Sequence, residues 1–258
     1  MDRPSGEFVQ AGPGHWGRDP TMARAGLVHG FSCRDMSPAG PAPEAAEGVA
    51  RDLAACLGVA ALPRTRLRQR HTAQVHLAPQ GGWGDREPPI GDALVAAGPG
   101  VVLELLTADC LPVLVLEPIR GVCGAAHAGW RGTLDGIVPA TLQALQRDLR
   151  AETAAAWVVV GPGIRACCYE VGPEVAAAFR DRWPEADKWM RPAASGRPHL
   201  DLALAVRAQA VAAGVPESRV LDTGWCTRCR HDRFFSYRAD GPGTGRIVTL
   251  ATVAGSGR

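Results

Sequence analysis

Three apolar runs near the middle of the chain, at 101–106, 111–117 and 121–127, constrain the fold more than any other feature. Short runs of this kind are typical of buried β-strands. Cys110 stands immediately before the second run, and His127 ends the third. Cysteine and histidine are preferred zinc ligands, and they also serve as nucleophile and base in catalysis. The sequence therefore predicts a buried sheet that carries a thiol and an imidazole.

Helix and strand patterns alternate irregularly along the rest of the chain. Helices are predicted at 44–58, 133–149, 173–183 and 201–213. Further strands are predicted at 26–33, 65–77 (with a kink), 92–96, 155–160, 219–222, 234–238 and 247–251. This mixed order indicates an α+β fold, a single layered domain of α/β/β/α type in which flanking helices pack on mixed β-sheets. The predicted division is an N-terminal arm or edge strand (1–25), a catalytic domain (26–252) and a C-terminal tail (253–258).

Composition excludes several classes of protein. The chain has 258 residues, of which 46% are hydrophobic, enough for a substantial core. A net charge of +2 argues against a nucleic-acid-binding protein. Glu104, Asp109 and Glu117 interrupt the longest apolar runs, which predicts that no segment spans a membrane. Eight cysteines without an N-terminal signal peptide indicate reduced thiols and a cytoplasmic location.

Two histidines compete to join Cys110 and His127 as a third ligand. His71 and His76 are separated by an odd number of residues, so on a regular strand they point to opposite faces. At most one of them then faces a shared centre. Two histidines and one cysteine with a free fourth position would form a zinc site of catalytic type. The residues alone leave the choice between the two histidines open.

Four separated motifs resemble those of one family. They are TADCLP at 107–112, HAGWRG at 127–132, GPGI and CCYEVG between 161 and 172, and CT, FFSYR and TGR between 226 and 246. Together they are similar to the laccase-domain family, whose members are described as polyphenol oxidases, purine nucleoside phosphorylases and peptidoglycan editing factors. The resemblance covers roughly residues 26–252.

The resemblance implies a zinc site, with copper as the alternative metal. Its ligands would be His71, Cys110 and His127. His71 occupies the family's Gln-Val-His-Gly motif because Gln69 stands two positions before it, although Arg70 and Thr72 replace the usual valine and glycine. His76 is the reserve ligand.

Substrate-binding roles follow from the same resemblance. Arg238, in the FFSYR motif, would face the metal pocket and bind phosphate, since an arginine fork suits that anion. Arg34 is the second phosphate candidate. Asp109, beside the thiolate ligand, is a candidate proton shuttle, with a structural role as its alternative. Together with Cys110, His127 and Arg238, it completes the predicted catalytic set.

The remaining cysteines carry a weaker signal. Cys226 and Cys229 have C-x-x-C spacing and precede His231, which can form half of a zinc site or a redox pair. No second C-x-x-C occurs in the sequence. Cys167 and Cys168 could join them in principle, but we interpret these two as packing or loop residues.

The implied function is zinc-dependent phosphorolysis of adenosine, inosine and methylthioadenosine, together with deamination of adenosine. The partners would then be a purine nucleoside and phosphate; the preferred nucleoside and the oligomeric state stay open. Alternatives are a copper polyphenol oxidase, a cysteine or zinc hydrolase that edits peptidoglycan precursors, and a binding module with a structural zinc.

Overall fold

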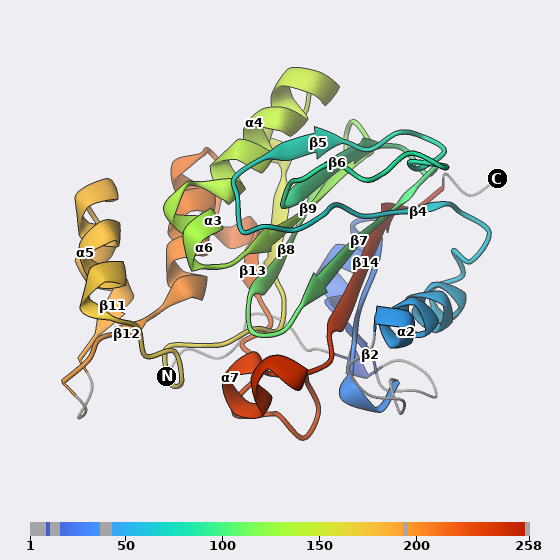
Figure 1. Ribbon diagram of the computed structural model, residues 1–258. Helices are drawn as coiled ribbons and strands as arrows, with labels where there is room; N and C mark the ends of the chain where they lie inside the picture. The colour runs from blue at the N-terminus through green and yellow to red at the C-terminus, as the bar shows by residue number, and fades with distance from the viewer. Residues whose placement is uncertain (1–8, 11–15, 37–42, 193–195, 256–258) are drawn as a thin grey trace.

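The computed structural model describes residues 9–10, 16–36, 43–192 and 196–255, so parts of the predicted arm and tail lie outside the described residues. Two six-stranded sheets form the centre of the molecule (Figure 1). The first has the order β1 (Val9–Gln10), β2 (Trp16–Arg18), β3 (Leu27–Ser32), β14 (Ile247–Val253), β7 (Val102–Thr107), β4 (Arg64–Thr65). The second has the order β13 (Val220–Asp222), β10 (Trp157–Val160), β8 (Leu111–Glu117), β9 (Val122–Ala128), β6 (Ala93–Ala97), β5 (Val75–Leu77).

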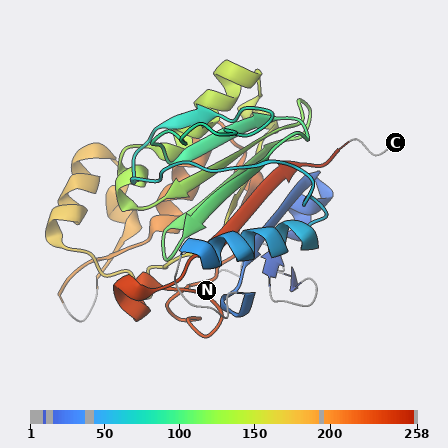
Figure 2. The same cartoon turned by 45° about the vertical axis from the view of Figure 1, so that its right-hand side comes forward.

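Helices cover the outer face of each sheet. Figure 2 shows α2 (Pro43–Cys56) lying along the first sheet, where its Leu53 packs with Leu250 of β14. The helices α3 (Trp130–Leu134), α4 (Ile137–Leu149) and α6 (Leu202–Ala212) pack near the second sheet. The other elements are α1 (Pro20–Arg24), α5 (Pro173–Arg182), α7 (Tyr237–Asp240) and the pair β11 (Met190–Arg191) and β12 (His199–Leu200). The predicted α/β/β/α layering is thus confirmed.

Strand β8 explains why the central runs are apolar throughout. Successive side chains of a strand point to opposite faces. Val113 and Val115 therefore join the core beneath the helices, whereas Leu114 and Leu116 join the core between the two sheets. Every residue of β8 is buried. A strand covered on both faces shows no polar alternation, as these runs predict.

Most predicted elements are found, but three predictions are wrong. The predicted strand at 65–77 exists only at its ends, as β4 and β5. The predicted helix at 133–149 is divided into α3 and α4, because Gly136 adopts the left-handed conformation with φ of 81°. The predicted strand at 234–238 is instead a buried loop leading into α7, where the Ser236 side chain accepts a hydrogen bond from the amide of Ala239 and caps the helix.

Part of the predicted N-terminal arm belongs to the first sheet. Strand β2 pairs with β3, and α1 follows it, capped by the carboxylate of Asp19. Among the described residues, no helix is long and apolar enough to cross a membrane.

Candidate metal centre

The hairpin of β8 and β9 places two of the predicted ligands side by side. The two strands are antiparallel, and Pro112 of β8 stands opposite His127 of β9. Cys110 lies just before β8, so the start of one strand and the end of the other bring its thiol beside the imidazole of His127. His127 is 4% exposed, and Cys110 is partly exposed. Strand pairing alone therefore brings together two of the three predicted ligands.

A buried carboxylate, Asp92, positions the third ligand. Asp92 stands just before β6, which pairs with β9. Its side-chain oxygens accept hydrogen bonds from the backbone amides of Arg70, His71 and Thr72, at 2.7–3.1 Å, and from the Thr72 hydroxyl at 2.8 Å. These amides cannot pair in a sheet while they bind the carboxylate, which is why the predicted strand is interrupted here.

Asp92 also orients His127. The Asp92 Oδ1 atom lies 2.8 Å from Nδ1 of His127, and this contact leaves Nε2 of the ring free to bind a metal. Ligating histidines are usually held in this way by a carboxylate on the other ring nitrogen. One fully buried carboxylate thus fixes two histidine positions.

The three predicted ligands converge. The candidate ligand atoms of His71, Cys110 and His127 all lie within 4.8 Å of one another. Cys110 Sγ lies 3.7 Å from His71 Nε2, and the two imidazole rings are 4.8 Å apart between centroids. Two nitrogens and one sulfur suit a tetrahedral zinc ion, whose fourth position stays open on this ligand count. His71 is the exposed member of the set, so the three residues are accessible from the solvent on its side.

The charges within the set favour metal binding. Burial alone would raise the pKa of Cys110, but the neighbouring His127 and His71 lower it to about 6. Burial alone would likewise lower the pKa of His127, but Cys110 and Asp92 raise it to about 9. The thiolate is the form that binds metals, and a cation would replace the proton held between the two side chains.

The backbone around the set is strained and tightly packed. His71 and Asp109 are two of the three non-glycine residues in the described part of the chain with positive φ, at 60° and 86°. Such conformations typically cost about 1–3 kcal/mol each and cluster at functional sites. Gly129 lies against the ligands, because a Cβ atom there would stand 2.8 Å from His71 Cδ2 and 2.9 Å from Cys110 Sγ.

His76, the reserve ligand, lies outside the set. Its Nε2 donates to the carbonyl oxygen of Ile90 at 2.8 Å, and its ring packs against Gly91. The structure brings His71 and not His76 beside Cys110 and His127, in keeping with the expectation that at most one of the two histidines faces a shared centre. The physical reason differs, however, because His71 is carried by an irregular loop rather than by a strand.

The predicted proton shuttle, Asp109, is buried and fully engaged. Its Oδ1 accepts a hydrogen bond from the Thr227 hydroxyl at 2.6 Å, and its Oδ2 accepts one from the backbone amide of Arg238 at 2.7 Å. Asp109 therefore ties the segment before Cys110 to the start of α7.

The two predicted phosphate ligands have different surroundings. Arg238 stacks on the ring of Tyr169 at 5.4 Å and donates to the carbonyl oxygen of Glu170 at 3.0 Å. Arg34 forms an ion pair with Asp240 and stacks on Phe235. Arg238 can therefore offer more of its guanidinium to a ligand than Arg34.

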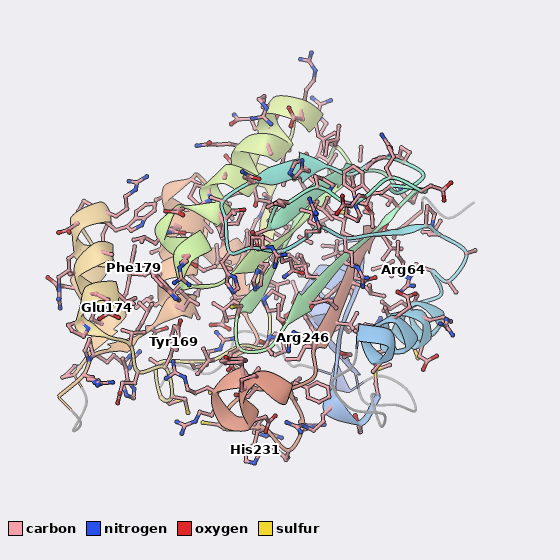
Figure 3. The ribbon with its side chains drawn as sticks, in the orientation of Figure 1. Arg64, Tyr169, Glu174, Phe179, His231 and Arg246 are labelled. Carbon is pink, nitrogen blue, oxygen red and sulfur yellow. The ribbon has the colours of Figure 1, made fainter. Side chains whose placement is uncertain are left out.

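Tyr169 was not predicted from the sequence. Burial raises the pKa of its hydroxyl, as do the charges of Cys110 and Asp109, while Arg238 lowers it. The Tyr169 ring therefore lies under the guanidinium of Arg238 and within electrostatic range of Cys110. Figure 3 shows Tyr169 and His231 on the side of the molecule where α7 lies.

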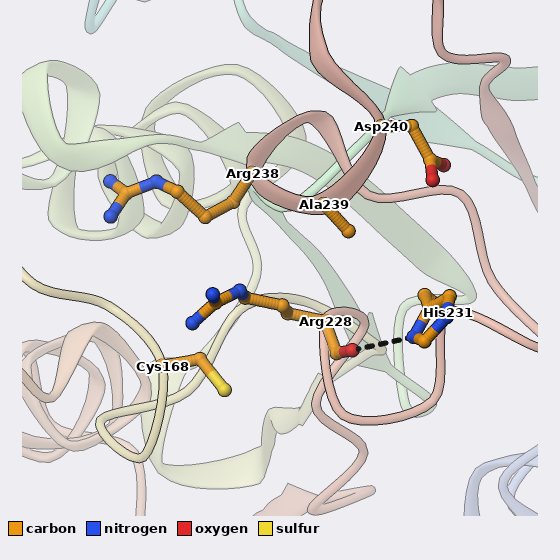
Figure 4. A pocket seen from close by; sticks show the side chains of 6 residues that line it. All are labelled: Cys168, Arg228, His231, Arg238, Ala239 and Asp240. Carbon is orange, nitrogen blue, oxygen red and sulfur yellow. Dashed lines mark hydrogen bonds between the residues drawn. The ribbon is translucent and has the colours of Figure 1, made fainter.

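A pocket of about 490 Å³ lies beside this arginine (Figure 4). It is lined by Cys168, Arg228, His231, Arg238, Ala239 and Asp240. Two arginines and one carboxylate line it: the side chains of Arg228 and Arg238 extend in the same direction, away from Asp240 (Figure 4), and Asp240 is already paired with Arg34. The pocket therefore suits a small anion.

Comparison with known proteins identifies the family of the chain. The sequence pattern of the family described as multi-copper polyphenol oxidoreductase laccase matches residues 33–254. The chain belongs to this family.

Relatives within the family carry enzyme names. The chain is 44% identical over 224 residues to a purine nucleoside phosphorylase of Deinococcus radiodurans, covering 86% of this chain and 82% of the relative. It is 39% identical over 159 residues to adenosine deaminase RL5 from an unknown prokaryotic organism, covering 61% and 60%. The crystal structure of YlmD from Geobacillus stearothermophilus matches with a TM-score of 0.86 at 29% identity, covering 96% of this chain and 99% of that one.

Proposed function

We propose that this chain is a zinc enzyme of purine nucleosides, which cleaves adenosine, inosine and methylthioadenosine with phosphate and also deaminates adenosine. The observation that carries the proposal is the convergence of His71, Cys110 and His127, an open donor set suited to zinc. The relatives named purine nucleoside phosphorylase and adenosine deaminase supply the substrate class. Bound zinc would supply Lewis acidity next to the nucleoside.

In phosphorolysis, Arg238 would bind the phosphate. A phosphate oxygen forms a bond to C1′ of the ribose, and the bond from C1′ to the purine nitrogen breaks. The base leaves with the bonding electrons and takes up a proton. The guanidinium of Arg238 holds the phosphate, while Tyr169 and the Glu170 carbonyl hold the guanidinium. Arg34 acts indirectly by pairing with Asp240 at the pocket wall.

Asp109 receives a positioning role in this proposal. Both of its carboxylate oxygens accept hydrogen bonds, one of them from the backbone of Arg238. Through these two hydrogen bonds, Asp109 holds the backbone of Arg238 and the side chain of Thr227 in place. In this proposal Cys110 and His127 contribute to catalysis as metal ligands.

The variant Arg238→Gln tests whether phosphorolysis and deamination depend on this arginine to different extents. Phosphorolysis uses phosphate, whereas deamination adds water to C6 and releases ammonia. We therefore expect the variant to lose phosphorolysis of adenosine by about 10–100-fold, the loss expected for one charged hydrogen bond, while deamination is little changed. The control is Arg180→Gln, since Arg180 is an exposed residue of α5 paired with Asp187.

Product analysis of the zinc-loaded protein decides the proposal. With adenosine and phosphate, we expect adenine and ribose-1-phosphate by chromatography, and with adenosine alone we expect inosine and ammonia. If protein with zinc bound forms neither adenine with phosphate nor inosine without it, the proposal is contradicted. Intense blue absorbance and phenol oxidation by copper-loaded protein would instead favour the polyphenol oxidase.

A further inference from the structure

A second group of potential metal ligands lies apart from His71, Cys110 and His127. It is a four-cysteine cluster, made of Cys167, Cys168, Cys226 and Cys229. The sequence favours a packing or loop role for Cys167 and Cys168 and leaves their joining Cys226 and Cys229 as the alternative. The structure contradicts a packing role, since Cys167 is exposed and both thiols lie beside that of Cys229. We propose that the four-cysteine cluster binds a zinc ion through four thiolates.

Sheet topology explains how the two halves meet. Strands β10 and β13 pair in parallel, so their carboxyl ends lie at the same edge of the second sheet. The loop after β10 carries Cys167 and Cys168, and the loop after β13 carries Cys226 and Cys229. Backbone hydrogen bonds join the loops, from Gly163 to the Trp225 carbonyl at 3.1 Å and from Thr227 to the Gly163 carbonyl at 3.2 Å. The two cysteine pairs are thus brought together by the fold.

The sulfur positions fit a tetrahedral ion. With Zn–S bonds of about 2.3 Å, the sulfurs of a four-thiolate site stand about 3.8 Å apart. Cys229 Sγ lies 3.6 Å from Cys167 Sγ and 3.4 Å from Cys168 Sγ, and all four sulfurs lie within 4.8 Å of one another. Small side-chain rotations would reach the ideal separation. No disulfide joins the eight cysteines, all of which belong to the described residues.

Local charge and backbone support four thiolates. A zinc ion with four thiolates carries a net charge of about −2. Arg228 stands between Cys226 and Cys229 in the sequence and lines the same pocket as Cys168 (Figure 4), so it can offset part of that charge. Backbone hydrogen bonds from Cys229 and Arg165 reach the sulfur of Cys226, where they would stabilise a metal-bound thiolate.

Four protein ligands leave no open position, so this zinc would be structural. It would fix Thr227, whose hydroxyl binds Asp109, and it would hold one wall of the pocket that contains Arg238. The second site would therefore stabilise the geometry of the first and supply no coordination position to a substrate. The inference does not depend on the proposed nucleoside activity, because its test measures metal.

Zinc analysis of variants tests the four-cysteine cluster. Protein purified with a reductant should contain about two zinc ions per chain, Cys229→Ser about one, and Cys110→Ala about one. The control Cys56→Ser, an exposed cysteine outside both sets, should retain about two. One zinc in the natural protein that survives Cys229→Ser and disappears with Cys110→Ala would overturn the proposal.

Cobalt spectroscopy covers the case in which Cys229→Ser fails to fold. Cobalt bound to Cys110→Ala protein should show the strong charge-transfer absorbance of a four-thiolate tetrahedral site, because the cluster is intact in that variant. Absence of these bands in folded Cys110→Ala would overturn the proposal. So would mass-spectrometric detection of a disulfide from Cys229 to Cys167 or Cys168 in protein kept reduced.

Discussion

At the scale of single residues, Asp92 has the largest role of any residue that the sequence analysis overlooked. It accepts hydrogen bonds from three consecutive backbone amides around His71 and contacts His127, so one side chain positions two metal ligands. Burial alone would raise the pKa of this carboxyl, but its hydrogen bonds to His127 and Thr72 lower it well below the usual range. Asp92 thus remains ionised at neutral pH.

Asp92→Asn should weaken zinc binding while the protein stays folded. Asparagine has the same shape, but its amide group places donors where the native site needs acceptors. Loss of such an outer partner typically reduces metal affinity 10–100-fold. Competition with a chelating dye measures this change. Asp148→Asn, on the surface of α4, is the control, and an equal effect of both substitutions would contradict the assigned role.

Gly129→Ala tests the packing around the ligands. The added methyl group would stand within 3 Å of His71 Cδ2 and Cys110 Sγ, so the ligands must move. We expect zinc affinity to fall by on the order of tenfold or more. Gly48→Ala in α2 is the matched control, because nothing lies within 4 Å of its Cβ and alanine favours helix. Unchanged zinc affinity in Gly129→Ala would contradict the proposed geometry.

At the scale of elements, β3 contains a buried histidine that makes stability depend on pH. Burial lowers the pKa of His29 to about 4, and its ring accepts a hydrogen bond from the Asp19 amide. In the unfolded chain the imidazole has its ordinary pKa of about 6.5, so the unfolded chain binds a proton first as the pH falls. Stability should be complete above about pH 6.5 and decline by up to about 3 kcal/mol as the pH approaches 4.

His29→Gln should remove this dependence. Urea unfolding between pH 7 and pH 4 measures the free energy of unfolding of both proteins. We expect the natural protein to lose more stability than the variant across that range. Equal losses in the two proteins would show that other groups cause the acid sensitivity.

Regular elements were more predictable from the sequence than the segments that carry the site. A continuous apolar run predicted β8, and helical spacing of apolar residues predicted α2. Both signals lie within the segment itself. They failed at 65–77, where the Asp92 carboxylate takes the backbone amides that a strand would use. They also failed at 234–238, where aromatic residues suggested a strand but two phenylalanines are buried in a loop. Whether such segments form strands or loops depends on contacts with residues that are distant in the sequence.

At the scale of the whole molecule, the order of the strands determines which potential metal ligands lie close together. The sequence suggested His71, Cys110 and His127 through motif resemblance, and the structure brings them together by pairing β8 with β9 and β6 with β9. The four-cysteine cluster arises from the parallel pairing of β10 with β13. Neither parallel pairing nor strand order could be predicted from local patterns, so the sequence left the joining of Cys167 and Cys168 to Cys226 and Cys229 as a possibility that it did not favour.

An anomalous diffraction map at the zinc absorption edge tests the central claim most directly. The natural protein is purified and crystallised in the presence of zinc, and crystals of Cys110→Ala prepared in the same way are the comparison. We predict a peak bonded to Cys110 Sγ, His71 Nε2 and His127 Nε2, and no peak at that place in Cys110→Ala. Fully loaded natural protein without a peak between these three residues would contradict the account.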